Sequence, residues 1–220
     1  MDKYFAELLG AFAGDGWMSK GKSSTSLFIT GNTKDEKQDY DERISFLFQK
    51  VFDKKVNPRN YPYWRTYGIY VSEKRIIDAF VGTGMPVGEK SMRVKVPELI
   101  LSDKMLMQSF LRGLFDTDGC ICFSKSYNKN ASKWQKSCRH IPEVFISTIS
   151  KQLAEQTSLI FQSINLQPTT RIIKSSRGYK PSYRIYIRSK SKTKQFFKIV
   201  QPKNQKHLDR FNQWHTQGFY

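Results

Sequence analysis

The sequence is poor in the residues that hold a fold together through disulfides or zinc. It has three cysteines and three histidines among 220 residues, and neither set shows a C-x-x-C pair or zinc-finger spacing. It has no long uncharged apolar run, and the segment after Met1 is too short for a secretory signal and too acidic for a mitochondrial presequence. A disulfide framework, a zinc finger and a membrane span are therefore excluded. Since no targeting signal is readable, we expect a cytoplasmic protein of a prokaryote, or an organellar one if it is encoded in an organelle.

Acidic residues are also scarce. The chain has 37 Lys and Arg against 19 Asp and Glu, a net charge of +18. The excess is uneven, because residues 1–102 carry 16 basic and 13 acidic side chains and residues 103–220 carry 21 and 6. Such a balance favours a phosphate-rich partner, above all a nucleic acid. A solvated basic surface without a dedicated partner is the plainer interpretation.

The same order of elements occurs twice along the chain. Residues 3–14 have the apolar spacing of a helix, followed by two short strands, a helix, a Tyr-rich hairpin and a short helix. The order repeats from residue 102 onward. Residues 85–101, with two prolines, have the composition of a linker. We therefore expect an α+β protein of two pseudo-symmetric αββαββα repeats with antiparallel sheets: 1–84 is the first repeat, 85–101 the linker, and 102–220 the second repeat with a C-terminal tail.

Each repeat opens with a similar phrase, LLGAFAGDG at residues 8–16 and LRGLFDTDG at residues 111–119. Small residues recur every fourth position in both helices, which allows two backbones to approach closely. If the helices lie side by side, Asp15 and Asp118 meet at their C-terminal ends. Asp-Gly is also a common helix stop, but its repetition at the same place in both repeats favours a paired function.

Two carboxylates at adjacent helix ends repel each other, and a hard cation such as Mg²⁺ relieves the repulsion. Two such ions can activate a water molecule and stabilise the leaving oxygen of a phosphodiester. Asp15 and Asp118 are therefore the candidate acids of a metal-dependent hydrolase.

The two phrases resemble the signature of the LAGLIDADG homing endonucleases at its hydrophobic positions, its third-position glycine and its final Asp-Gly. The second phrase also has Asp116, whereas Ala13 departs from the signature at a position that is not a metal acid. The resemblance covers essentially the whole chain. It implies a monomer of two domains, paired through these helices, whose saddle-shaped sheets follow the major groove of about twenty base pairs of DNA.

The resemblance also implies metal use and site residues. Both strands are cut with Mg²⁺, or with Mn²⁺ as a substitute, while Ca²⁺ binds without supporting cleavage. Asp15 and Asp118 become the metal acids, with the carbonyl oxygens of Gly14 and Thr117 as further ligands. An active-site lysine is placed at Lys95, and its counterpart at Lys206 rather than Lys203. Polar residues at the ends of the second strands, Asn32 and Ser150, are expected to contact water or metal.

Residues that read DNA should lie on the strands, pointing away from the helices, because successive side chains alternate between the faces of a sheet. Around residues 182–189 this alternation turns Ile185 and Ile187 toward the helices. The expected DNA-facing set is Ser19, Ser23, Tyr70, Cys122, Ser124, Ser147, Arg171, Lys174, Arg184, Tyr186 and Arg188.

The function that we predict is site-specific double-strand cleavage of DNA in the service of intron mobility. Because the first phrase begins so near Met1, we expect a freestanding protein without a protein-splicing domain. The alternative is a binding protein on the same scaffold, either an RNA maturase that binds intron RNA or a DNA-binding regulator. Retention of both acids favours the nuclease, since a pure binder has no reason to keep two repelling carboxylates together.

Overall fold

The computed structural model describes residues 1–22, 24–33, 36–126, 139–174 and 180–217. The first repeat consists of α1 (Lys3–Asp15), β1 (Gly16–Lys20), β2 (Thr25–Asn32), α2 (Lys37–Asp39), the π-helical turn η1 (Tyr40–Ile44), α3 (Ser45–Phe52), β3 (Arg59–Tyr61), β4 (Thr66–Val71) and α4 (Lys74–Gly82). The segment that follows includes the short helix α5 (Glu98–Leu101). The second repeat consists of α6 (Lys104–Asp118), β5 (Gly119–Ser126), β6 (Arg139–Thr148), α7 (Lys151–Ser163), β7 (Thr169–Ile173), β8 (Ser182–Arg188), α8 (Lys190–Val200) and α9 (Gln205–Gln217).

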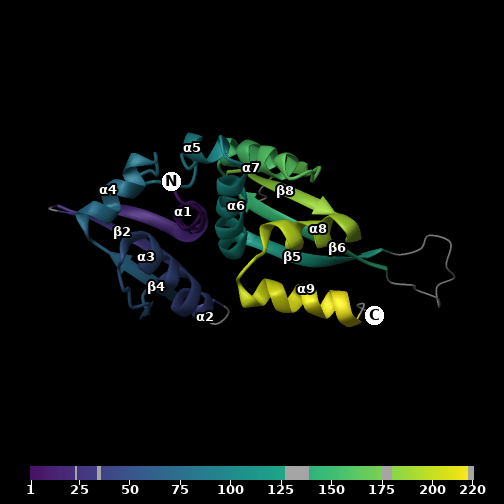
Figure 1. Ribbon diagram of the computed structural model, residues 1–220, viewed down its shortest axis with the longest axis horizontal. Coiled ribbons are helices and arrows are strands. Elements are labelled where there is room, and N and C mark those ends of the chain that lie inside the picture. The colour runs from purple at the N-terminus through teal and green to yellow at the C-terminus, as the bar shows by residue number, and fades with distance from the viewer. Residues whose placement is uncertain (23, 34–35, 127–138, 175–179, 218–220) are drawn as a thin grey trace.

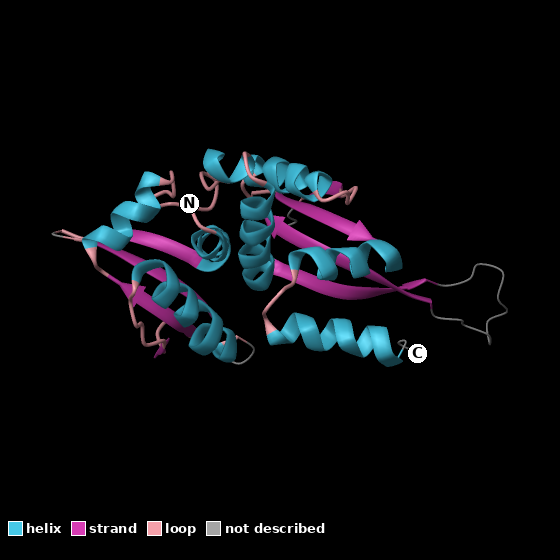
Figure 2. Ribbon diagram, viewed as in Figure 1, coloured by secondary structure: helices cyan, strands magenta, loops and turns pink. Residues whose placement is uncertain are grey.

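Each repeat builds one four-stranded antiparallel sheet, in the orders β1-β2-β4-β3 and β5-β6-β8-β7. The predicted α+β class and repeated αββαββα order are confirmed. The registers correspond as well: Gly16 lies opposite Ile29 and Gly119 opposite Ile146, so each sheet begins at the end of its signature helix. Figure 2 shows the two sheets on either side of a central pair of helices.

The central pair is α1 and α6, and their glycines explain how closely they approach (Figure 1). A Cβ on Gly10 would overlap the carbonyl oxygen of Phe110, and a Cβ on Gly113 would overlap that of Glu7. Asp2 and Asp103 cap the N-termini by accepting backbone N–H bonds, as aspartate does at this position. The predicted contact of two small-residue ridges is therefore present.

The core lies between each sheet and its helices and is continuous across the repeats. Met18, Leu27 and Ile69 in the first sheet, and Val144 and Ile185 in the second, face it. Strand alternation consequently leaves the other face of each sheet uncovered by this core.

Two segments differ from the expectation. Residues 85–101 are packed rather than solvated, because Val94, Val96 and Ile100 are fully or almost fully buried. The tail, which carried no predicted element, forms α9 beside β5, and its Trp214 ring lies 6.5 Å from Phe123. Among the described residues no helix combines the length and apolarity needed to cross a lipid bilayer.

Candidate active site

The ends of α1 and α6 bring Asp15 and Asp118 into one site. Gly14 makes this possible, because a Cβ there would overlap the hydroxyl of Thr117 and lie 3.4 Å from the carboxyl carbon of Asp118. Each helix ends directly at the first residue of a strand, Gly16 or Gly119. The two acids that the repeated phrases predict are therefore neighbours across the pseudo-twofold axis.

Both carboxyl groups are electrostatically strained. The pKa of Asp15 is raised to about 8, mainly by burial and also by the nearby charges of Asp118 and Glu36, against a hydrogen bond from Tyr40. That bond joins the Tyr40 hydroxyl to Asp15 Oδ2 at 3.0 Å. Burial also raises the pKa of Asp118, with Glu36 adding to the effect and Lys90 opposing it. Nearby positive charge would favour the ionised form of both acids.

The lysine that the structure places at the end of α1 is Lys90, and not the predicted Lys95. Lys90 Nζ donates to three carbonyl oxygens at the end of α1, at 3.0 Å to Phe12, 2.8 Å to Ala13 and 2.5 Å to Gly14. Lys95 instead lies 3.9 Å from Glu98 at the start of α5, with its side chain 38% exposed. The linker folds back on α1, and only its earlier lysine reaches the negative helix end.

Burial lowers the pKa of Lys90 to about 8, while the charges of Asp118 and Asp15 oppose that shift. With this pKa, the Lys90 ammonium can lose and regain a proton near neutral pH. It also occupies the Gly14 carbonyl oxygen, one of the predicted metal ligands. A metal bound to that oxygen would have to displace Lys90 from it.

The structure places Lys206, at the start of α9, beside Glu36, a carboxyl group whose charge acts on both Asp15 and Asp118. Its Nζ donates to Glu36 Oε1 at 3.0 Å. Lys206 follows Tyr186 by as many residues as Lys90 follows Tyr70, and the two tyrosines hold equivalent positions in the two sheets. Lys203 lies elsewhere, with its backbone N–H donating to Asp116 Oδ2 at 2.9 Å. The choice of Lys206 over Lys203 agrees with this geometry.

Glu36 is a site residue that the sequence analysis missed. It accepts the backbone N–H of Asn32 at Oε2, at 2.7 Å. A Cβ on Gly31 would overlap that oxygen and lie 3.0 Å from Asp15 Oδ2, so both carboxyl groups converge over Gly31. Glu36 stands in a mixed run of charges, KDEK, with no motif to single it out. Its position could be recognised only once the chain after β2 is seen to fold over α1.

The two predicted polar residues behave differently. Ser150 is fully buried and caps α7: its hydroxyl accepts the Leu153 N–H and donates to the carbonyl oxygen of Val94 at 2.6 Å. The expected contact with water or metal is not formed, because the hydroxyl is buried and its one proton is donated to Val94. Asn32 is exposed at the end of β2, and its backbone holds Glu36.

The protein groups at this site fit a divalent cation that takes some of its ligands from the protein and the rest from a substrate. Asp15 and Asp118 supply hard oxygens, and a cation between them would favour their ionised form. In the described part of the chain, no three His, Cys, Asp or Glu side chains form a metal-holding group. Thr117 directs its hydroxyl to its own helix, donating to Gly113 O at 3.0 Å. Phosphate oxygens and water would therefore complete the shell, as is usual for Mg²⁺.

A cleft of about 230 Å³ opens beside Asp118. Lys90, Gly14, Ser147 and Ser182 contribute to its lining. The Ser147 hydroxyl is buried and has no hydrogen-bond partner within the described residues. The cleft thus places a lysine and a carboxyl group beside one phosphate-sized space.

The predicted DNA-facing residues lie mostly as expected. Tyr186, Arg184 and Arg188 alternate with the buried Ile185 and Ile187. The same alternation turns Ser19, Tyr70, Cys122, Ser147 and Arg171 away from the core. Lys174 follows the end of β7 and is exposed. Ser23 and the side chain of Ser124 lie outside the described residues.

Comparisons with known proteins agree with this architecture. The family model described as a LAGLIDADG-like domain matches residues 105–201. The Replication factor C small subunit of Methanocaldococcus jannaschii is 31% identical over 136 residues, which are 59% of this chain and 7% of that protein. The chain therefore spans less than a tenth of the curated relative that it matches.

Solved structures match over nearly the whole chain. The crystal structure of I-DmoI in complex with DNA and Mn has a TM-score of 0.62 and 17% identity, and the match covers 90% of this chain and 96% of that one. I-SmaMI bound to uncleaved DNA target in the presence of calcium ions has a TM-score of 0.62 and 12% identity, with 96% and 89% covered. The predicted resemblance to the LAGLIDADG homing endonucleases is confirmed for the fold.

Proposed function

Because residues 105–201 form a LAGLIDADG-like domain within the fold of the LAGLIDADG homing endonucleases, we propose that this chain is a site-specific endonuclease that hydrolyses both strands of a DNA target. The observation that carries the proposal is the pairing of Asp15 with Asp118 at the abutting ends of α1 and α6. A binding protein gains nothing from burying two repelling carboxyl groups side by side.

The acids and the lysines of the site have different roles in the proposed hydrolysis. Asp15 and Asp118 hold the site for divalent metal, Mg²⁺ or in its place Mn²⁺, with Ca²⁺ supporting binding alone. The metal supplies activation of a water molecule and charge for the leaving oxygen. Lys90 brings an ammonium group to the end of α1 and Lys206 brings one to Glu36, and both would offset negative charge that develops on the phosphate. The carbonyls of Gly14 and Thr117 remain predicted ligands.

The substrate that we propose is a long duplex of about twenty base pairs, bound by a monomer along both sheets. The Mn- and calcium-containing DNA complexes of I-DmoI and I-SmaMI support a DNA target and the use of divalent metal. We further propose that the chain serves intron mobility in the cytoplasm or in an organelle. Contact with intron RNA is the role of the alternative, a maturase.

The test exposes a plasmid pool with random inserts to the full chain and Mg²⁺, and sequences the linear products. We expect cutting at one recurring site, and none with EDTA. Asp15→Asn and Asp118→Asn should abolish double-strand cutting and leave binding of that site largely intact. Asparagine keeps the size of aspartate and resembles the neutral form that burial favours, so folding should persist. Cutting at a near-normal rate by either variant would refute the assignment.

A matched control is Asp78→Asn, which changes a surface aspartate paired with Lys74 and should leave cutting unchanged. Retention of intron RNA by a chain that cuts no plasmid in Mg²⁺ would instead identify the maturase.

A further inference from the structure

The outward face of the first sheet carries a cluster of aromatic rings, which we call the aromatic platform: Trp17, Phe28, Tyr61, Trp64 and Tyr70. Trp17, Phe28 and Tyr70 are direct neighbours across β1, β2 and β4. The Trp17 and Phe28 rings stack at 4.7 Å with an interplanar angle of 6°, and Phe28 lies 5.1 Å from Tyr70. Trp64 meets both Trp17 and Phe28 edge-on, at 5.6 and 5.7 Å.

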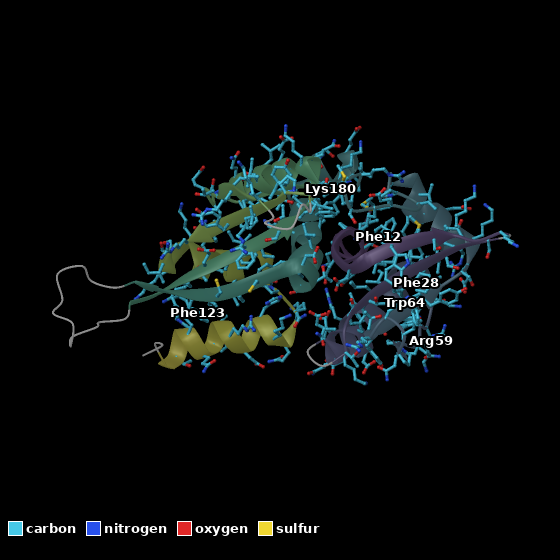
Figure 3. The ribbon with its side chains drawn as sticks, turned by 180° about the vertical axis from the view of Figure 1, so that it is seen from behind. Phe12, Phe28, Arg59, Trp64, Phe123 and Lys180 are labelled. Carbon is cyan, nitrogen blue, oxygen red and sulfur yellow. The ribbon has the colours of Figure 1, made fainter. Side chains whose placement is uncertain are left out.

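The platform points away from the core and reaches solvent. Its strand neighbours Met18, Leu27 and Ile69 are fully buried, so alternation turns Trp17, Phe28 and Tyr70 outward. Trp64 is 47% and Tyr70 40% exposed. Figure 3, which views the molecule from behind, places Phe28, Trp64 and Arg59 close together on the first repeat. Large apolar side chains grouped at a surface mark a binding face.

The equivalent face of the second sheet is built from arginine. Phe145 and Tyr186 hold the places of Phe28 and Tyr70. Arg184 lies over the Phe145 ring at 4.1 Å, and Arg171 lies 5.5 Å from the Tyr186 ring. We call Phe145, Arg171, Arg184, Tyr186 and Arg188 the arginine platform.

One position separates the two faces most sharply. Gly68 pairs with Thr30 as Arg184 pairs with Ser147, so glycine stands in the first sheet where the second has arginine. A Cβ on Gly68 would overlap the carbonyl oxygen of Ile29, so this place cannot accept a longer side chain without distortion. Arg59 occupies the place of Arg171 and lies 5.3 Å from the Tyr61 ring and 5.6 Å from the Tyr70 ring. The difference agrees with the net charges of the two parts of the chain, +3 for residues 1–102 and +15 for residues 103–220.

We propose that the two repeats read the halves of one DNA site by different chemistry. The aromatic platform contacts thymine methyl groups in an A·T-rich half-site, and the arginine platform pairs with guanines in the other half. Apolar side chains recognise thymine by its methyl group, whereas arginine binds two acceptors of guanine in the major groove. This inference rests on the DNA recognition proposed above.

Duplex DNA suits the platform better than a single strand. Bases of single-stranded RNA are bound by stacking on free ring faces. Here Trp17 and Phe28 stack on each other, and Trp64 covers the edges of both. The parts of Trp64 and Tyr70 that remain exposed offer apolar area that fits methyl groups projecting from a groove.

The test begins by selecting random duplexes that bind the full chain in Ca²⁺. The recurring duplex is then made with deoxyuridine, which lacks the methyl group, in place of thymine in one half or the other. We expect the substitution to weaken binding about tenfold in one half and to have no effect in the other. In a Trp64→Ser/Tyr70→Ser variant that loss should disappear.

The arginines are tested on the same duplex. Arg171→Gln/Arg188→Gln should relax the guanine preference of the other half, whereas the aromatic variant should keep that preference. Leu159→Ser, which removes a 57% exposed side chain from α7, is the matched control and should change neither readout. Circular dichroism and thermal melting verify that each variant is folded.

Equal sensitivity to deoxyuridine in both halves, or in neither, overturns this inference while leaving DNA recognition intact. Loss of single-stranded RNA binding, rather than of duplex binding, in the aromatic variant overturns it in favour of base stacking. If no duplex is selected at all, both this inference and the proposed DNA recognition fail.

Discussion

At the scale of single residues, the paired acids make the free protein sensitive to pH. Asp15 has a pKa of about 8 in the folded chain, mainly because it is buried, against an ordinary value of 3.8. Between these values the folded chain holds a proton on Asp15 that the unfolded chain has lost. Raising the pH through this window therefore lowers the stability of the metal-free protein.

We predict that Asp15→Asn stabilises the metal-free chain at pH 8 and leaves it almost unchanged at pH 4. The gain should be at least about 1 kcal/mol. A shift of one pKa unit corresponds to about 1.4 kcal/mol, and the pKa of Asp15 is shifted by more than one unit. Urea unfolding in EDTA at both pH values measures it. Burial raises the pKa of Asp39 to about 7, so part of the pH dependence of stability remains in the variant. A gain of equal size at both pH values would show that Asp15 is not the titrating group.

Lys90 has the opposite pH dependence. Burial lowers its pKa to about 8 from 10.5, so above pH 8 the unfolded chain holds the extra proton and stability rises with pH. In the proposed reaction its larger role is at the phosphate. We predict that Lys90→Met lowers the cleavage rate about 100-fold, the effect of removing one donor from a charge-stabilising site.

The matched variant is Lys95→Met, which removes an ammonium that lies 3.9 Å from Glu98 and away from the acids. It should cut at a normal rate. Single-turnover cleavage of the recurring duplex, with the affinity measured in Ca²⁺, separates a loss of chemistry from a loss of binding. Equal losses of cleavage rate in both variants would contradict the assignment of Lys90, rather than Lys95, to the active site.

At the scale of elements, the glycines of α1 and α6 set the distance between the two acids. Gly10→Ala would force a methyl group into the carbonyl oxygen of Phe110, whereas Gly82 on α4 has open space around it. We predict that Gly10→Ala costs about 1–3 kcal/mol of unfolding free energy, as overpacking does. Cleavage should fall as well, because the helices and their acids move apart.

Gly82→Ala is the control, and it should change stability by no more than about 1 kcal/mol, the difference in helix propensity. Thermal melting and the cleavage rate of both variants are the measurements. A Gly10→Ala chain with normal stability would mean that α1 and α6 can shift enough to accommodate the methyl group without loss of unfolding free energy.

Local patterns predicted the elements that follow from periodicity. The four-residue spacing of small side chains around Gly10 and Gly113 gave the helix pair, and alternation around Ile185 gave the outward face of β8. Lys90 and Glu36 escaped prediction, because each reaches the acids through a segment that folds back on α1 without a repeating pattern. The helix α9 escaped it because most of the tail is polar. Its few rings pack on the second repeat, with Phe211 stacked on Phe197 at 4.0 Å and Trp214 at 6.5 Å from Phe123.

At the scale of the whole molecule, a buried ion network joins the repeats. Glu7 of α1 has a side chain that is 2% exposed, and it binds Arg43 of η1 at 2.6 Å and Arg112 of α6 at 2.9 Å. Arg112 also donates to the carbonyl oxygen of Val200 at the end of α8, at 2.7 Å. One carboxylate therefore connects elements of both repeats next to the helix pair.

This network predicts that the two repeats unfold together. In urea, tryptophan fluorescence and far-ultraviolet circular dichroism should follow one coincident transition, since two of the four tryptophans, Trp17 and Trp64, belong to the first repeat and the other two, Trp134 and Trp214, to the second. Glu7→Gln leaves two guanidinium groups without their shared charge and should cost about 3–5 kcal/mol, as breaking a buried ion pair does.

The matched change is Asp78→Asn, which breaks the pair with Lys74, where the side chains are 57% and 88% exposed. It should cost less than about 1 kcal/mol, because water replaces an exposed partner. If Glu7→Gln also separates the fluorescence and dichroism transitions, the network does more than add to the unfolding free energy: it is what makes the two repeats unfold together. If Glu7→Gln costs no more than Asp78→Asn, the two arginines find other partners, and the coupling lies in the glycine contacts of α1 and α6 alone.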